Sequence, residues 1–339
     1  MSEIMVSVIC LTYNHKKYIK KTLDSIIEQK TNFIYEILVH DDASNDGTTD
    51  IIKSYMEKYP NLIHLFLQAE NQFSKKNYRA SYDLVYPNAR GKYIAVCEGD
   101  DYWIDKCKLQ KQFNFLESHL QYGFVAHPAF KIDKQGLPLN EILGPVDLFD
   151  RDITLSKDAV IHYPTASMFY RRELKTKVPY WYYKNGEAGD YVSQLVLLEK
   201  APGYYMHDIM SVYRTMTPGS SNERMQNMSK EEKIKYYKER MEILKIVDKE
   251  TGYIHSKEFR LFYMDFERAI ILCEKKFIRR IKLCFKYMRN YKNVVLKIKL
   301  RFVIPCIIPN TYHLIAVKQK KRLMNSIIKK YIKCDLCEG

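Results

Sequence analysis

The segment that decides the fold is YEILVHDDAS, at residues 35–44. Its first half is rich in apolar and β-forming residues, which is typical of a buried strand, and two acids follow directly. The same pattern recurs at residues 93–101, where YIAVC precedes EGDD. Because a parallel α/β sheet binds ligands beyond the carboxyl ends of its strands, we expect both acidic clusters to face a ligand.

Strand and helix patterns alternate around these two segments. Residues 5–11 have the pattern of a strand, and apolar residues at helical spacing follow over residues 19–27. A second helix pattern covers residues 51–59, and a third short strand pattern covers residues 62–67. This alternation predicts an α/β fold with a mostly parallel sheet flanked by helices.

A different region begins after residue 222. Beyond about residue 229 the apolar residues recur only at helical spacing. We therefore expect an α/β domain over residues 1–222 and a basic, mostly helical region over residues 223–339.

The net charge of +15 is concentrated in the second region. Residues 275–333 contain 18 Lys or Arg and no Asp or Glu, so the rest of the chain carries a net charge of −3. A cationic segment of this kind favours an anionic lipid surface or a nucleic acid as partner.

The cysteines and the N-terminus predict a cytoplasmic protein. Eight cysteines stand at irregular spacings, several of them inside apolar patterns, which is typical of a reducing compartment. No signal sequence precedes the first strand, and no apolar run reaches the roughly 18 residues needed to cross a bilayer. The basic segment leaves peripheral attachment to the inner face of the cell membrane open.

The two acidic clusters also predict a metal ion. Carboxylates in a ligand cleft repel an anionic ligand unless a divalent cation lies between them. Mn²⁺ and Mg²⁺ accept carboxylate oxygens on one side and phosphate oxygens on the other. A metal-bridged diphosphate is therefore the first interpretation of this edge of the sheet.

Several motifs, taken in their order along the chain, resemble those of the family 2 glycosyltransferases with the GT-A fold. They are VSVICLTYN at residues 6–14, DDASNDGT at residues 41–48, EGDD at residues 98–101, GDY at residues 189–191 and SVYR at residues 211–214. The resemblance covers about residues 4–222 and leaves the basic region unmatched.

This resemblance implies a function as well as a fold. It implies inverting transfer of a sugar from a nucleotide-diphospho-sugar, with a UDP-sugar as the first expectation, assisted by Mn²⁺ or Mg²⁺. The acceptor it implies is a hydroxyl of a saccharide or of a lipid-linked molecule. The setting it implies is bacterial surface-polysaccharide assembly, such as capsule or lipopolysaccharide.

By the same resemblance, Thr12, Tyr13, Asn14 and Asp42 hold the base and ribose of the donor. A carboxylate can accept a hydrogen bond from a uracil N–H or a ribose hydroxyl, and a tyrosine ring can stack on the base. Asp41 fits a turn or cap before the next helix as well as it fits the donor site, so both roles stay open.

The EGDD motif resembles the D-x-D element of the family, which places Asp100 and Asp101 on the ribose and the metal. The family more often has Asp where Glu98 stands, so the role of Glu98 stays open. Gly99 is expected to let the ligand approach closely. The alternative is an acidic turn that caps the following helix.

Asp190 resembles the general base of the family, which removes the acceptor proton while the metal stabilises the leaving diphosphate. An aspartate at this position could also cap a helix, and both roles can hold together. Glu187 is the second candidate for the base.

Arg214 precedes a flexible loop and carries a planar positive fork suited to phosphate. Relatives often have a histidine in this loop, where Met216 or Thr217 stands here. An ordinary surface arginine is the alternative.

The basic region contains one strongly amphipathic segment, in which Phe277, Ile281, Phe285 and Met288 share a helix with five Lys or Arg. This composition is typical of an interfacial helix on an anionic membrane. The alternative is a bundle that packs its apolar face on the catalytic domain and keeps a solvated basic exterior.

Two other function classes use some of the same features. A sugar-nucleotide nucleotidyltransferase also uses paired carboxylates and a metal, but it usually has a glycine-rich turn after the first strand, and residues 12–15 contain no glycine. A nucleic-acid-binding protein would act through the basic region. The acidic clusters make nucleic acid an unlikely partner.

Overall fold

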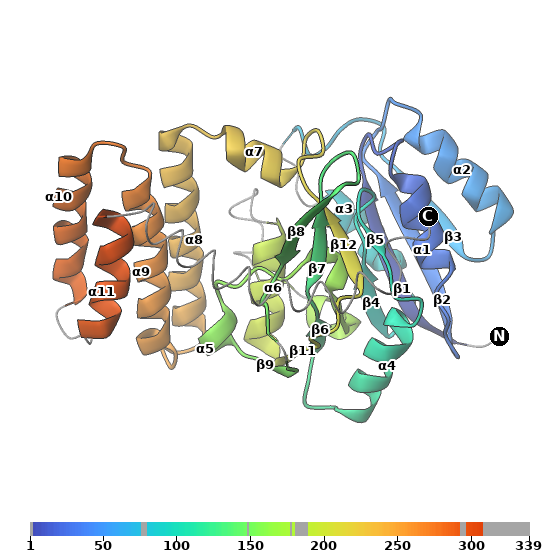
Figure 1. The fold of residues 1–339 in the computed structure, drawn as a ribbon. Helices are drawn as coiled ribbons and strands as arrows, with labels where there is room; N and C mark the ends of the chain where they lie inside the picture. Colours follow the sequence, from blue (N-terminus) through green and yellow to red (C-terminus); the bar gives the residue numbers. More distant parts are fainter. Residues whose placement is uncertain are drawn as a thin grey trace. The chain divides into compact units, whose positions relative to one another are not determined.

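The computed structural model describes residues 3–75, 80–147, 149–176, 178–179, 189–291 and 296–307. Contacts within the chain divide it into two compact units, Met1–Thr217 and Pro218–Gly339. Figure 1 shows strands and helices in the first unit and helices in the second. Glu187 and residues 308–333 of the basic segment lie outside the described residues.

The first unit is built on an eight-stranded mixed sheet with the order β3-β2-β1-β4-β10-β6-β11-β9. Its strands are β1 (Ile4–Thr12), β2 (Ile34–Asp41), β3 (Ile63–Leu67), β4 (Tyr93–Val96), β6 (Phe124–Ala126), β9 (Arg151–Ile153), β10 (Phe169–Arg171) and β11 (Gly203–Tyr205). The first four strands pair in parallel, whereas β10 is antiparallel to both β4 and β6. The predicted α/β class is confirmed, and most of the parallel pairing lies in the first four strands.

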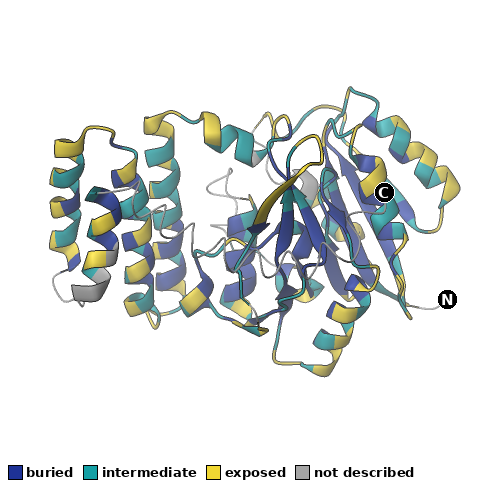
Figure 2. Cartoon of the chain, viewed as in Figure 1, coloured by how far each residue is buried: buried dark blue, intermediate teal, exposed yellow. Residues whose placement is uncertain are grey.

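The centre of this sheet is buried on both faces. Val6, Val8 and Cys10 of β1 are inaccessible to solvent, and Figure 2 shows the neighbouring strands buried as well. The flanking helices are α1 (Ile19–Ile27), α2 (Thr48–Lys58), α3 (Ala80–Val85), α4 (Lys108–Ser118), α5 (Leu155–Asp158) and α6 (Gly189–Lys200). Helix α1 buries Ile19 and Leu23 in the same core, as their helical spacing predicts.

A second, four-stranded sheet places residues 211–214 beside the EGDD loop. Its order is β5-β12-β7-β8, with β5 (Tyr102–Trp103), β7 (Ala129–Ile132), β8 (Pro138–Leu143) and β12 (Ser211–Arg214). Ser211 pairs with Trp103 and Val212 with Tyr102 in antiparallel register. Because β5 begins one residue after Asp101, this pairing holds Arg214 near the acids.

An ion pair between the buried Glu36 and the exposed Arg90 lies near the amino ends of the parallel strands. The Glu36 carboxylate accepts hydrogen bonds from Arg90 Nε (2.8 Å) and from Ser7 Oγ (2.7 Å). Ser7 Oγ in turn accepts the backbone N–H of Gly91 at 2.9 Å. A Cβ on Gly91 would stand 2.4 Å from the Ser7 nitrogen, so only glycine fits here.

Lys108 of the first unit is fully buried. Lys108 Nζ donates to Gln112 Oε1 at 2.7 Å and lies 4.2 Å from the centre of the Trp103 ring. Burial lowers the pKa of Lys108 to about 7 because the charged amine loses its hydration.

We expect Lys108 to make the first unit more stable as the pH rises above neutrality. The unfolded chain keeps this proton up to a pKa of about 10.5, so unfolding in this range takes up a proton. The free energy of unfolding then rises by at most about 1.4 kcal/mol per pH unit. Denaturation of the wild type and of Lys108→Met at about pH 7 and pH 8.5 measures the effect. Equal pH slopes in the two proteins would contradict it.

The second unit is helical. Its helices are α7 (Ser221–Asn227), α8 (Lys230–Glu250), α9 (Ser256–Leu272), α10 (Phe277–Met288) and α11 (Leu296–Ile307), and Figure 1 shows α8 to α11 running side by side. Ser229 begins α8 with a capping box completed by Glu232. Across the described residues, no helix combines the length and the apolar character needed to cross a membrane.

Candidate active site

The loops after β1 and β2 interlock. The Asn14 backbone N–H donates to Ser44 Oγ at 2.9 Å, and its side-chain oxygen accepts from the Asn45 N–H at 2.9 Å. Asn14 adopts a left-handed backbone with φ of +54°, which an asparagine tolerates well. The Asp42 N–H donates to the Thr12 carbonyl at 3.1 Å. The structure therefore brings Thr12, Asn14 and Asp42 together at the carboxyl edge of the sheet.

The two acids after β2 make different contacts. Asp41 is fully buried, and its carboxylate accepts from the Ser44 N–H (3.0 Å) and from the Thr49 hydroxyl. Asp41 thus stabilises the turn before α2, which is the alternative that its sequence position left open. Tyr13 is 39% exposed at the same edge, so part of its side chain is open to solvent.

Asp42 holds a loop that the sequence did not single out. Its two carboxylate oxygens accept the backbone N–H groups of Gln72 (2.9 Å) and Phe73 (3.0 Å). These residues follow β3, whose carboxyl end lies beside that of β2. The sequence feature that could have indicated this loop is its polar composition directly after a parallel strand.

Gly99 makes room for protein side chains. A Cβ on Gly99 would stand 2.6 Å from Thr12 Oγ1 and 2.8 Å from His15 Nδ1. Both of these atoms are buried and lack a hydrogen-bond partner among the residues that the structure describes. The missing side chain of Gly99 therefore lets the loops after β1 and β4 pack together, and its expected role in ligand approach stays a prediction.

Asp100 and Asp101 are held in different ways. Asp101 is 1% exposed, and its Oδ1 accepts the Arg214 backbone N–H at 2.8 Å. Its Oδ2 is buried without a partner in the described part of the chain. Asp100 is more accessible, and its Oδ2 accepts the Thr217 hydroxyl at 2.7 Å.

Four acids share this end of the sheet. Burial raises the pKa of Glu98 well above its usual range, and the negative charges of Asp190, Asp100 and Asp101 raise it further. Burial also raises the pKa of Asp101, with a further contribution from Asp100. Asp190 is the second residue of α6, and its charge acts on Glu98 and Asp101 from a distant part of the sequence. Clustered acids of this kind favour a bound cation or a proton.

Arg214 braces the acidic loop. It is 6% exposed, so the alternative of an ordinary surface arginine is wrong. Its Nε donates to the Asp100 carbonyl at 3.0 Å, and its guanidinium lies 4.4 Å from the centre of the Tyr18 ring. Part of the Arg214 guanidinium that could bind phosphate is therefore already hydrogen-bonded within the protein.

Thr217 is a further residue at the site. Thr217 is 1% exposed and donates a hydrogen bond to Asp100. The residue before it, Met216, has a left-handed backbone with φ of +63°. Thr217 stands in the loop after β12. The sequence placed it there but did not predict its contact with Asp100.

Lys175 anchors the beginning of α6. It ends the short 3₁₀ helix Arg172–Lys175 and is buried. Its Nζ donates to Tyr86 Oη at 3.2 Å and to Ser193 Oγ, one turn after Asp190. Burial lowers the pKa of Lys175 to about 7, although the charge of Asp190 opposes this shift. The sequence did not predict this residue.

Comparison with known proteins decides the family. The family model described as "Glycosyl transferase family 2" matches residues 7–176, which is half of the chain. The chain belongs to glycosyl transferase family 2. The matched range contains the interlocked loops and the EGDD motif, so the resemblance on which those residues were chosen is confirmed at the level of the family.

Curated relatives match half or more of this glycosyl transferase family 2 protein. An uncharacterized protein of Mycobacterium tuberculosis is 37% identical over 171 residues, which is 50% of this chain and 47% of the relative. TuaG of Bacillus subtilis, named as a teichuronic acid biosynthesis glycosyltransferase, is 28% identical over 65% of this chain and 82% of its own length. The match spans about half the length of the first of these relatives.

Solved structures of low sequence identity share the fold of this glycosyl transferase family 2 chain. S. aureus TarS 1–349 in complex with UDP-GlcNAc has a TM-score of 0.54 at 18% identity, over 90% of this chain and 82% of that one. The mannosyltransferase PcManGT from Pyrobaculum calidifontis, in complex with GDP-Man and Mn²⁺, has a TM-score of 0.54 at 14% identity, over 99% and 88%. The predicted GT-A-like fold with a C-terminal helical region is confirmed.

The acids fit a metal ion chemically. No group of three or more His, Cys, Asp or Glu within the described ranges is arranged to hold a metal on its own. Mg²⁺ and similar ions commonly take one or two carboxylates and complete their shell with water and substrate phosphates. The unpartnered Oδ2 of Asp101 and the partly exposed carboxylate of Asp100 are the donors that such an ion would use.

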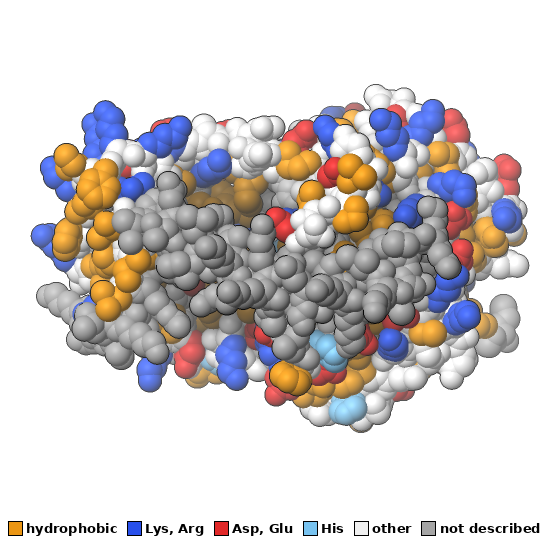
Figure 3. Space-filling model, in the orientation of Figure 1, with side chains coloured by type: hydrophobic (Ala, Val, Ile, Leu, Met, Phe, Trp, Pro, Cys, Tyr) orange, Lys and Arg blue, Asp and Glu red, His pale blue; other side chains and the backbone are white. Residues whose placement is uncertain are grey.

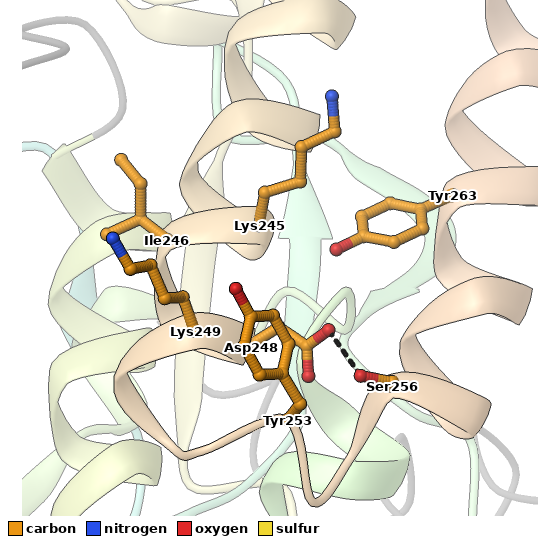
Figure 4. Close-up of a pocket in the computed structure, with 7 residues that line it drawn as sticks. All are labelled: Lys245, Ile246, Asp248, Lys249, Tyr253, Ser256 and Tyr263. Atoms are coloured by element: carbon orange, nitrogen blue, oxygen red, sulfur yellow. Dashed lines mark hydrogen bonds between the residues drawn. The ribbon is translucent and has the colours of Figure 1, made fainter.

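A separate hollow of about 560 Å³ lies in the helical unit, between α8 and α9. It is lined by Lys245, Ile246, Asp248, Lys249, Tyr253, Ser256 and Tyr263. Figure 4 shows the hydrogen bond of 2.8 Å from Ser256 Oγ to Asp248 that joins the two helices. None of the residues predicted for catalysis or donor binding lines this hollow.

Proposed function

We propose that this family 2 protein transfers a sugar from a nucleotide-diphospho-sugar to a hydroxyl group, with inversion at the anomeric carbon. The observation that carries the proposal is the meeting of Glu98, Asp100, Asp101 and Asp190 at the carboxyl edge of the parallel strands. Nucleotide sugars bound to the structural neighbours TarS and PcManGT support the donor class.

The interlocked loops after β1 and β2 would receive the nucleoside. Asp42 is already fixed by two backbone N–H groups and keeps further acceptor capacity on its carboxylate, because each oxygen can accept more than one hydrogen bond. Tyr13 offers a partly exposed ring for stacking on a base. These features suit uracil and make a UDP-sugar the first donor to test.

Mn²⁺ or Mg²⁺ would be held by Asp100 and Asp101, and when bound it neutralises charge on the leaving diphosphate. Thr217 Oγ1 and the Arg214 N–H fix one oxygen of each carboxylate. The orientation of both acids is therefore set before a ligand enters. Glu98 is retained as a further member of the site, and burial beside the other acids favours its neutral form.

Asp190 would act as the general base that takes the proton of the attacking hydroxyl. The buried Lys175 donates to Ser193 in α6, and we expect this contact to help position the Asp190 carboxylate. Glu187 is retained as the second candidate for the base. A role for Arg214 toward the donor phosphates is also retained, although its Nε and Nη1 donate to the Asp100 and Asp133 carbonyls.

The acceptor we propose is a saccharide or a lipid-linked molecule in bacterial surface-polysaccharide assembly. The name of TuaG, for teichuronic acid biosynthesis, supports this setting. The unmatched helical region leaves room for acceptor selection outside the family domain.

A thermal-shift screen of nucleotide sugars with and without Mn²⁺ tests the proposal. A ligand at 100 times its Kd should stabilise the protein by about 2.7 kcal/mol, and we expect a UDP-sugar with Mn²⁺ to do so. Nucleoside triphosphate with a sugar 1-phosphate is the matched control for a nucleotidyltransferase. Stabilisation by this pair alone, or by none of the compounds, would overturn the proposed function.

A further inference from the structure

Helix α10 presents a face that its own bundle does not use. This outer face consists of Ile278, Arg279, Lys282, Phe285, Lys286 and Arg289, all exposed, the last directly following the helix. Ile278, Lys282, Phe285 and Arg289 follow one another at intervals of four, three and four residues, so they form one stripe. On the opposite side, Cys284 is buried in a cluster with Ile271 and Phe302.

Two large apolar side chains stand out of this face. Ile278 is 69% exposed and Phe285 is 70% exposed, although the helix has a buried side that could hold them. Figure 3 shows hydrophobic side chains gathered beside Lys and Arg over this helix. The sequence left two alternatives for this segment, an interfacial helix and a helix packed in a bundle. Packing in the bundle explains the burial of Cys284 but not the exposure of the outer face.

The charge around the stripe has a single sign. Residues 275–291 contain seven Lys or Arg and no Asp or Glu. A face made only for solubility usually mixes both signs of charge and does not expose Phe and Ile between cations. An anionic bilayer has lipid phosphates above apolar acyl chains, so it is complementary both to the cations and to the exposed apolar side chains of this face.

We propose that the outer face of α10 docks on an anionic lipid bilayer. Ile278 and Phe285 insert at the boundary between headgroups and acyl chains, and Lys282, Lys286 and Arg289 contact the lipid phosphates. The attachment is peripheral and holds the enzyme at a surface where a lipid-linked acceptor would be found. This docking goes beyond the proposed sugar transfer and does not depend on it.

Co-sedimentation of the full chain with lipid vesicles tests the proposal, in the absence of donor and metal. We expect binding to vesicles of equal parts phosphatidylglycerol and phosphatidylcholine and little binding to phosphatidylcholine alone. The triple variant Lys282→Ala, Lys286→Ala and Arg289→Ala should bind about a hundredfold more weakly, at about fivefold per cation. The double variant Ile278→Ser and Phe285→Ser should lose at least about tenfold.

Matched controls come from equally exposed residues elsewhere. Leu120 is 76% exposed and Phe149 is 78% exposed, and Leu120→Ser with Phe149→Ser should leave vesicle binding unchanged. Lys53→Ala, Lys157→Ala and Lys235→Ala remove three exposed cations from other elements and should have little effect. Thermal melts of all variants verify that the outer-face substitutions leave the fold intact.

Several results would overturn the docking proposal. One is equal binding to both kinds of vesicle, and another is unchanged binding in both outer-face variants. Loss of binding in the cation variant alone, with competition by duplex DNA, would indicate a general polyanion surface. A dimer in solution that Phe285→Ser converts to a monomer would indicate that a second copy covers the face. Because no donor is present in the assay, these results leave the proposed sugar transfer untouched.

Discussion

Asp190→Asn is expected to slow the release of nucleoside diphosphate from the preferred donor by roughly a thousandfold, which lies within the range for loss of a general base. The amide has the size of the carboxylate but cannot take the proton of the attacking hydroxyl or water. Donor binding should persist, because the loops after β1 and β2 hold the nucleoside in our proposal. Product release and the donor-induced thermal shift, measured on the same samples, separate these two effects.

Glu199→Gln is the matched control for this substitution. It makes the same carboxylate-to-amide change at the other end of α6 and should leave the rate within a factor of two or so, as for most substitutions away from a site. A wild-type rate in Asp190→Asn would show that Asp190 is not the base, and Glu187 would then be the candidate to test. A parallel loss of donor binding would instead place Asp190 on the donor.

Asp100→Asn is expected to lower activity by about a thousandfold at ordinary Mn²⁺ concentration, because a metal ion stabilises the leaving diphosphate by several kcal/mol. An amide oxygen is a weaker ligand for a hard divalent ion than a carboxylate oxygen. Part of the lost activity should return as the Mn²⁺ concentration rises. A titration of activity against Mn²⁺ in the wild type and the variant measures this shift.

Two further variants sharpen this test. Asp50→Asn alters an exposed carboxylate in the first turn of α2 and should leave the Mn²⁺ titration unchanged. Thr217→Val removes the hydroxyl that orients Asp100, and a loss of at least about tenfold is expected from one hydrogen bond to a charged carboxylate. If Asp100→Asn keeps the wild-type titration, the metal is not held by Asp100.

The sequence predicted the edge of the sheet at which the site lies. Strand patterns over residues 5–11, 35–39, 62–67 and 93–97 each end in a polar segment, and β1 to β4 bring these ends together. Parallel pairing makes this step reliable, because it places every carboxyl end on one side. The resemblance to the family then selected residues within that edge.

Contacts across long stretches of sequence could not be predicted in this way. Nothing in the pattern around Gly99 shows that Thr12 and His15 fill the space beside it. Lys175 reaches Ser193 only because η3, the segment Arg172–Lys175, packs against α6. Such contacts depend on tertiary packing, which local periodicity does not encode.

The antiparallel pairing within the main sheet could not be predicted from the sequence either. Strand β10 has three residues and lies between β4 and β6, although a long stretch of sequence separates it from both. A strand this short has too few alternating positions to reveal its neighbours. Arg214 illustrates the same limit, since its burial follows from the pairing of β12 with β5 and β7.

The ion pair between Glu36 and Arg90 lies at the end of the sheet away from the acids of the site. Damage there and damage at the EGDD loop should therefore be visible to different assays. Changes at Gly91 or Glu36 reduce how much folded enzyme a cell accumulates, because they act on the unfolding equilibrium. Changes at Asp100 or Asp190 reduce what each folded molecule accomplishes. An engineer could therefore strengthen the first end to raise yield without retuning the chemistry at the second.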